Sequence, residues 1–301
     1  MNESIHKYMK PGLIHFMAYP EVMGGEGPIL ETLAEIAHDA DFTAVEIAHV
    51  NDADERRQVR DLCATAGLTV AYAAQPTILS QGLNPNSLDE EERREAAEAL
   101  AGEMQMAAEI GAGGMAILSG PDPGDADRPT AIDAMARTCR ALCDRGAELG
   151  LNLALETFDR DIDKKALIGP SADAVALAKA VDRENFGLLV DLSHLPLQHE
   201  TAREALGAVR DYLVHAHLGN CVMQDPSSPA YGDMHPRFGY PGGENGVPEV
   251  AEFLQALLDI GFLTPDAPPI VSFEVKPQQG ETSRAVVANA KRVLRQAWAR
   301  V

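Results

Sequence analysis

Four side chains that bind hard metal ions follow apolar stretches in the second half of the chain. The stretches 151–156, 186–191, 213–217 and 270–274 end in Glu156, Asp191, His217 and Glu274. Uncharged apolar runs of this length are typical of buried parallel strands, so each ligand is expected at the C-terminal end of its strand. Three carboxylates held close together repel one another unless a cation lies between them. Carboxylate oxygens and an imidazole nitrogen suit Mn²⁺, Mg²⁺, Co²⁺ or Zn²⁺, so these residues predict a divalent-metal site.

Strand-like and helix-like segments alternate along the whole chain. Four further apolar runs predict strands over 12–19, 44–49, 68–74 and 113–118, and amphipathic segments predict helices over 28–40, 52–66, 87–110, 130–150, 171–181, 200–209, 248–260 and 282–299. Eight strand–helix units predict a parallel sheet closed into a (β/α)8 barrel, whose active site lies at the C-terminal ends of the strands. An open doubly wound sheet is disfavoured because no glycine-rich nucleotide-binding loop follows a strand. We therefore predict one domain over residues 1–301, a TIM barrel with a long loop, 219–246, after strand seven.

The position of the four ligands on neighbouring strands matters more than any one of them. A single acid at a strand end is more often a helix cap or an ion-pair partner, and a single histidine is more often a hydrogen-bonded structural group. In a barrel, strands five to eight are neighbours, so their C-terminal ends meet at one rim. The joint arrangement therefore favours the metal interpretation.

The charge balance and the cysteines exclude some partners and compartments. The 301 residues include 25 basic and 46 acidic side chains, which gives a net charge of −21. This balance argues against nucleic acid and anionic membrane surfaces, which both need a basic face, and solubility is its ordinary explanation. The four cysteines form no CxxC pair, which predicts free thiols in a reducing cytoplasm rather than disulfides or a zinc ribbon. The polar residues 1–10 and the lack of a run of about 20 apolar residues also favour a cytoplasmic protein without a membrane partner.

The order Glu, Asp, His, Glu on strands five to eight resembles the xylose isomerase-like barrel superfamily. That superfamily includes sugar isomerases and epimerases, hydroxypyruvate isomerase, inosose dehydratase and barrel-type apurinic endonucleases. The motifs that carry the resemblance are Leu-Glu-Thr-Phe-Asp at 155–159, Asp191-x-x-His194, His215-x-His217 and Phe273-Glu274. The resemblance implies that Glu156, Asp191, His217 and Glu274 hold one divalent ion, with Mn²⁺ favoured. It also implies that His194 contacts substrate, as in the ketose 3-epimerase branch, and that Glu156 and Glu274 exchange protons with the substrate from opposite sides.

The chemistry of such a site agrees with these roles. A metal ion that chelates a carbonyl and the adjacent hydroxyl acidifies the C–H of the carbon next to the carbonyl. Two carboxylates can then remove that proton and return it elsewhere. Return of the proton to the opposite face of the same carbon gives an epimer, and its return to the next carbon gives an isomer. Loss of a β-substituent in place of proton return gives an elimination product. We therefore predict a metal-dependent sugar isomerase or epimerase acting on a ketose or oxo-sugar. A lyase acting on a 3-oxo-glycoside or an inosose is the alternative.

Further candidate substrate contacts lie in the long loop and near other strand ends. The loop 219–246 is similar to the branch that includes C-glycoside deglycosidase α-subunits. Within it, His235 is a candidate acid or base and Arg237 a candidate anchor for an anion or hydroxyl, although both residues could equally brace the loop. Glu46 and His49, which flank the end of strand two, and Lys276, two residues after Glu274, are candidate sugar-hydroxyl contacts, with structural roles as the alternative.

The resemblance also sets expectations for partners and leaves two other functions open. We expect a small sugar or oxo-glycoside as ligand and a homo-oligomer, and a deglycosidase-like enzyme would also require a separate small β-subunit. A DNA-repair endonuclease of the same superfamily is disfavoured by the net charge of −21 and because the sequence shows no extra His or Asp ligands of a trinuclear site. The other function is that of a non-catalytic sugar-binding subunit, in which the four predicted metal ligands would take no part in a reaction.

Overall fold

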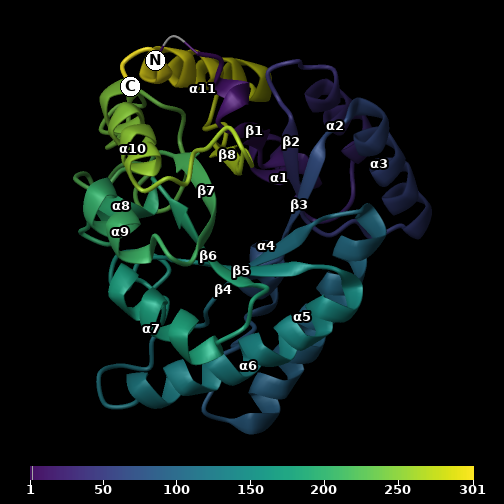
Figure 1. The fold of residues 1–301 in the computed structure, drawn as a ribbon, viewed down its shortest axis with the longest axis vertical. Helices are drawn as coiled ribbons and strands as arrows, with labels where there is room; N and C mark the ends of the chain where they lie inside the picture. The colour runs from purple at the N-terminus through teal and green to yellow at the C-terminus, as the bar shows by residue number, and fades with distance from the viewer. Residues whose placement is uncertain (2) are drawn as a thin grey trace.

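Eight parallel strands form a barrel inside a ring of helices (Figure 1) in the computed structural model, which describes residue 1 and residues 3–301. The strands are β1 (Lys10–Leu13), β2 (Ala44–Ile47), β3 (Thr69–Ala73), β4 (Gly114–Leu118), β5 (Asn152–Glu156), β6 (Phe186–Asp191), β7 (Leu213–Gly219) and β8 (Ile270–Glu274). Their order in the sheet is β1-β8-β7-β6-β5-β4-β3-β2. A parallel bridge between Ile14 and Glu46 brings β1 and β2 together and closes the barrel. The predicted (β/α)8 barrel is confirmed.

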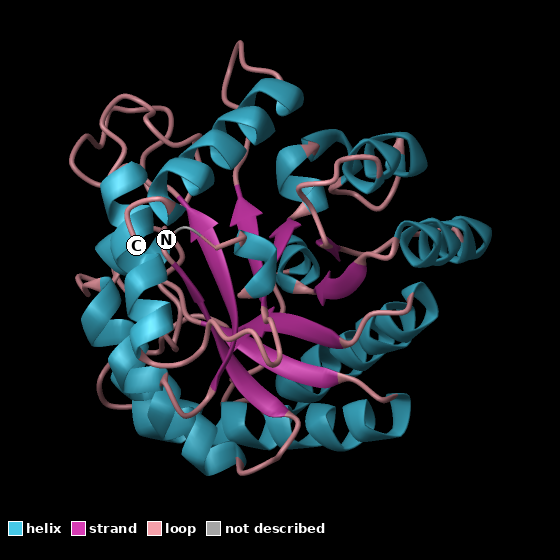
Figure 2. Ribbon diagram, turned by 45° about the horizontal axis from the view of Figure 1, so that its top comes forward, coloured by secondary structure: helices cyan, strands magenta, loops and turns pink. Residues whose placement is uncertain are grey.

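The helices form the outer layer around the strands (Figure 2). One long helix follows each strand: α2 (Ile29–Ala37), α3 (Ala53–Ala66), α5 (Glu90–Ile110), α6 (Arg128–Leu149), α7 (Ser171–Val181), α9 (Ala202–Val209), α10 (Val247–Asp259) and α11 (Ser283–Trp298). Short helical segments are η1 (Ile5–Lys7), α1 (His15–Ala18), η2 (Pro20–Val22), α4 (Gln75–Gln81) and α8 (His194–Leu197). Local signals set the helix ends. In α3, Asp52 accepts a hydrogen bond from the Glu55 N–H, and Gly67 ends the helix at a φ of 72°.

Two of the differences from the predicted elements lie where β1 and β3 end. The first strand ends at Leu13 rather than at Tyr19, because only Lys10–Leu13 pairs with β8 and the following residues turn into α1. The predicted loop after β3 contains α4, which has a proline in its first turn and ends at Gly82 with a φ of 63°. Both short helices contribute side chains to the mouth of the barrel.

The long loop after β7 is held in place by buried amides. The side chain of Asn220 donates to the carbonyl of Arg237 at 3.0 Å and accepts from the N–H of Asn245 at 2.8 Å. The side chain of Asn245 donates to two backbone carbonyls at 3.1 Å each. The N–H of Lys276 donates to the carbonyl of His235 at 2.7 Å, which ties the loop to the chain just after β8. The loop is therefore a fixed part of the barrel mouth.

The interior between strands and helices is apolar. Strand β6 is buried along its whole length, and the large side chains Tyr72, Phe253 and Phe273 are fully buried. The cysteines are buried free thiols, which agrees with the predicted absence of a disulfide framework within the described residues. In the same part of the chain, no helix combines the length and apolar character that crossing a membrane requires.

Candidate metal centre

The four predicted metal ligands converge at the C-terminal ends of β5 to β8. Glu156, Asp191 and Glu274 are the last residues of their strands, and His217 lies in register with Asp191. One oxygen or nitrogen atom from each side chain lies within 4.8 Å of the others. The Nδ1 atom of His217 is 2.8 Å from Oε2 of Glu274 and 3.4 Å from Oε1 of Glu156. Donor atoms this close together fit a single ion with mixed oxygen and nitrogen ligands.

The atoms that face one another in this cluster are buried, and their close contacts are with one another. Glu156 Oε1, Asp191 Oδ2, His217 Nδ1 and Glu274 Oε2 find no hydrogen-bond partner within the described ranges. The outward oxygens are held, since Gln75 Nε2 donates to Glu156 Oε2 at 2.7 Å and a backbone N–H donates to Asp191 Oδ1 at 2.6 Å. Each buried polar atom without a partner costs about 1–3 kcal/mol. Four such atoms directed at one point fit a divalent cation that would pair with all of them.

The electrostatics of the cluster also fit a cation. Burial raises the pKa of Glu274 to about 7, and repulsion from Glu156 adds to this rise. Burial works to raise the pKa of Asp191, but three neighbouring imidazoles lower it below its ordinary value. Burial works to lower the pKa of His217, but the surrounding carboxylates raise it well above its ordinary value. The carboxylates thus hold a proton on the imidazole, and a bound metal ion would replace that positive charge.

A second cluster of ligand-type side chains lies beside the first. Asp191, His194 and His235 bring donor atoms within 4.8 Å of one another. Oδ1 of Asp233 lies 3.0 Å from Nε2 of His194 and 2.8 Å from Nε2 of His235. The chain therefore has further His and Asp side chains close enough to share a cation, which weakens that argument against an endonuclease, whereas the net charge of −21 still argues against a nucleic-acid substrate. These donors suit a second cation or the hydroxyls of a substrate.

A cavity of about 810 Å³ is lined by three of the four predicted metal ligands, Glu156, His217 and Glu274. This volume lies in the range of about 300–1,000 Å³ that is usual for small-molecule sites. Of the predicted site residues, the lining contains Glu156, His217, Glu274, His49, His235 and Lys276. Asp191 and His194 are fully buried below this lining, where Nδ1 of His194 is 2.8 Å from the carbonyl of Thr157. The structure thus brings three of the six predicted substrate contacts, His49, His235 and Lys276, to the lining of one cavity.

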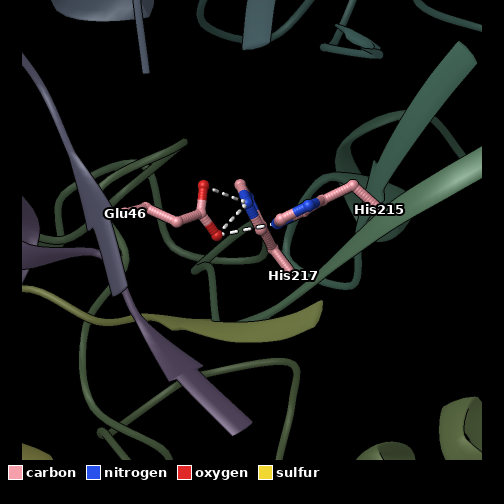
Figure 3. Close-up of side chains that lie close together, drawn as sticks. All are labelled: Glu46, His215 and His217. Carbon is pink, nitrogen blue, oxygen red and sulfur yellow. Dashed lines mark hydrogen bonds and ion pairs between the residues drawn. The ribbon is translucent and has the colours of Figure 1, made fainter. Parts of the chain in front are cut away.

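Two predicted substrate contacts lie elsewhere. The guanidinium of Arg237 donates to Glu281 Oε1 at 2.7 Å and to the carbonyl of Gly239 at 3.0 Å, so it braces the long loop outside the cavity lining. Glu46 is 1% exposed and points across the barrel interior toward His215 and His217 (Figure 3). Its side chain borders a separate cavity of about 160 Å³ inside the barrel. For both residues the structural alternative fits the observed contacts.

The sequence interpretation missed Asp233 and Lys164. Asp159 accepts hydrogen bonds from the N–H groups of residues 162–164, and this turn carries Lys164 to the cavity. There the ammonium lies 3.1 Å from Oδ2 of Asp233, whose Oδ1 faces the two histidines. Asp233 stands two residues before His235, the same spacing as His215 and His217, and this repeated pattern was the available signal. Nothing local in the sequence distinguishes Lys164 from a solvent-exposed lysine.

Residues 34–297 match the family model described as xylose isomerase-like TIM barrel. Because this match covers most of the chain, the protein belongs to the xylose isomerase-like TIM barrel family. The resemblance seen in the sequence is therefore confirmed. Among curated proteins, none matches the chain significantly.

Solved structures of sugar epimerases and related proteins share the fold. D-psicose 3-epimerase from Clostridium cellulolyticum, solved with D-tagatose, is 19% identical, with 97% of this chain and 96% of that chain covered and a TM-score of 0.68. The IOLI protein with a bound zinc atom is 16% identical, with coverage of 97% and 99% and a TM-score of 0.75. The 3-keto-D-glucoside 4-epimerase YcjR from E. coli is 17% identical, with coverage of 95% and 98% and a TM-score of 0.65. At these identities the likeness establishes the shared fold.

Proposed function

We propose that this protein is a divalent-metal-dependent sugar isomerase or epimerase that moves a proton next to the carbonyl of a ketose or oxo-sugar. The observation that carries the proposal is the convergence of four buried ligand atoms, unpaired within the described residues, at the floor of a sugar-sized cavity. The fold neighbours support it, since they include a ketose 3-epimerase and a 3-keto-glucoside epimerase. The zinc atom of IOLI supports a divalent ion in this fold, and the mixed ligand set suits Mn²⁺, the ion that we propose here, as well as Zn²⁺.

The two carboxylates that line the cavity are suited to proton transfer. A bound divalent cation would polarise the substrate's carbonyl and neighbouring hydroxyl, which acidifies the C–H between them. Burial raises the pKa of Glu274 to about 7, close to the value at which a carboxylate both accepts and returns a proton near neutral pH. Gln75 holds one oxygen of Glu156 and leaves the other directed at the cluster. Glu156 and Glu274 are therefore the proposed proton-transfer pair.

The second cluster supports an elimination reaction as the alternative outcome. Burial works to lower the pKa of His235, but Asp233 and Glu274 raise it to about 9. The imidazole is then protonated at neutral pH and faces the cavity, where it can donate a proton to a departing oxygen. A substrate with a leaving group next to the acidified C–H, such as a 3-oxo-glycoside, would therefore be cleaved rather than rearranged.

Solvent deuterium exchange tests the proposal directly. The Mn²⁺-loaded protein in D₂O is offered ketoses and 3-oxo-glucosides, and NMR follows deuterium at the carbon next to the carbonyl. We expect incorporation that is lost in Glu156→Gln and Glu274→Gln, and the product distinguishes rearrangement from elimination. Glu103→Gln is the matched control, because Glu103 is a buried carboxylate that pairs with Tyr72 outside the cavity lining. Exchange that persists in both site variants would refute the assigned proton-transfer pair.

A further inference from the structure

A buried carboxylate and two imidazoles meet inside the barrel, below the metal centre. Glu46 comes from β2, and His215 and His217 come from β7, and the three side chains point toward one another (Figure 3). Nε2 of His215 lies 2.7 Å from Oε1 of Glu46, and Nε2 of His217 lies 3.1 Å and 3.3 Å from its two oxygens. The two histidines are two residues apart on one strand, so they share its inner face.

The two ring nitrogens of His217 face different partners. Nδ1 lies 2.8 Å from Glu274 and 3.4 Å from Glu156, on the side of the metal ligands. Nε2 faces Glu46 on the opposite side of the ring. A carboxylate accepts the hydrogen of an N–H group, and such a contact sets which nitrogen of a neutral imidazole carries the hydrogen. With the hydrogen on Nε2, the lone pair of Nδ1 is free to bind a metal ion.

We infer that Glu46 is a positioning residue that fixes the tautomer and the orientation of His217 as a metal ligand. The inference rests on the proposed metal centre and replaces the predicted role of Glu46 as a sugar contact. Both oxygens of Glu46 lie near the same ring nitrogen, which restricts rotation of the imidazole about its side-chain bonds. Carboxylates that hold a metal-binding histidine in this way typically account for about 10–100-fold in metal affinity.

His215 provides a matched comparison, because it touches the same carboxylate but forms no hydrogen bond or ion pair with Glu156, Asp191 or Glu274 in the described contacts. Its ring stands edge-on to that of His217, with ring centroids 5.1 Å apart and an interplanar angle of 89°. It borders the small cavity inside the barrel, while His217 lines the large one. A general loss of packing in the barrel interior would follow from changing either Glu46 or His215. A specific loss of metal affinity is expected when Glu46, the acceptor for His217, is removed, and it is not expected when His215 is changed.

Mn²⁺ titration followed by the EPR signal of the free ion tests the inference. We expect Glu46→Met, which lacks a strong acceptor, to weaken Mn²⁺ binding by about 10–100-fold. Glu46→Gln keeps an amide oxygen in place and should recover most of the parental affinity, and His215→Phe should stay close to it. The melting temperature of the metal-free proteins is measured alongside, since a merely structural role would lower that temperature without changing the Mn²⁺ affinity of the folded protein.

The outcomes separate this inference from the proposed function. If the parent protein binds no Mn²⁺, the metal centre itself is refuted. If the parent binds Mn²⁺ and folded Glu46→Met binds it equally well, only the positioning role of Glu46 is refuted. Should Glu46→Met fail to fold, Glu46→Asp replaces it, because its carboxylate is withdrawn by one methylene from His217. Parental affinity in Glu46→Asp would likewise overturn the inference.

Discussion

The two halves of the barrel mouth contribute different chemistry to the cavity. Strands β5 to β8 and their loops supply ionisable side chains, including three of the proposed metal ligands, namely Glu156, Lys164, His217, Asp233, His235, Glu274 and Lys276. The segments after β1 to β3 supply mainly an apolar wall, with Phe16, Met17, Met23, Pro76 and Leu79 beside His49, Gln75 and Ser80. The proposed metal ligands stand on strand residues paired to neighbouring strands, whereas the apolar wall stands on short helices and loops. We call the segments of β5 to β8 the chemical half of the mouth and the segments after β1 to β3 the covering half. The proposed metal ligands of the chemical half are thus held by the sheet itself, whereas the covering half is built from short helices and loops.

Removing one carboxylate from the chemical half is the strongest test of this division. Asp191→Asn keeps the shape of the side chain but replaces a charged ligand with a neutral amide. We expect Mn²⁺ affinity to fall by roughly 100-fold or more, because ligand charge is a main determinant of affinity for hard cations. Titration with Mn²⁺ measures the effect. Ser119→Ala after β4, a buried position outside the cavity lining, is the control that should bind as the parent does.

The pH dependence of metal binding tests whether the chemical half carries protons that the cation displaces. Burial raises the pKa of Glu274 to about 7, so below this pH the metal-free carboxyl is protonated and a cation must displace that proton. Mn²⁺ affinity should therefore fall as the pH drops below about 7, by about tenfold per pH unit for each proton displaced. Calorimetry in buffers of different ionisation enthalpy should show proton release on binding. An affinity that does not change between about pH 6 and pH 8 would contradict this electrostatic description.

One side chain of the covering half, Gln75, hydrogen-bonds to the proposed metal ligand Glu156, and its removal should lower Mn²⁺ affinity by an intermediate amount. The amide of Gln75 at the start of α4 donates to Glu156 at 2.7 Å. Gln75→Leu should weaken Mn²⁺ binding by about tenfold, since it removes a hydrogen bond that orients the ligand. Leu79→Ser on the same helix is the matched control, because Leu79 is 49% exposed and lies on the apolar wall. Equal affinities in the two variants would mean that the covering half does not support the metal centre.

The smallest effect is expected at Arg237, which braces the long loop from outside the cavity. Its ion pair with Glu281 is partly exposed, with 34% and 19% of the two side chains accessible. Arg237→Ala should lower stability by about 0–1 kcal/mol, the usual contribution of such a pair, and should leave KM nearly unchanged. Thermal melting and steady-state kinetics provide the measurements, and Glu281→Gln should behave alike. A large rise in KM for Arg237→Ala alone would restore its predicted role as a substrate anchor.

The eight-fold alternation and the convergence of the four proposed metal ligands could be predicted because both depend on local patterns. An apolar run reports a buried strand, and the residue that ends the run lies at the rim whichever helix packs behind it. This is why Glu156, Asp191, His217 and Glu274 could be grouped from the printed sequence. The first strand was predicted too long because residues after Leu13 are apolar for a different reason, since they form α1 and line the cavity.

Contacts between residues far apart in the chain decided the remaining features. Glu46 ends near His217, 171 residues away, and Arg237 meets Glu281, 44 residues away, although local patterns marked both as cavity residues. Asp233 joins His194 and His235 only because the long loop folds back over the strand ends. The apolar run in the sequence shows at which end of a strand a side chain lies. The direction in which that side chain points is set by the partners that pair with its charge in the folded protein, and these partners come from anywhere in the chain.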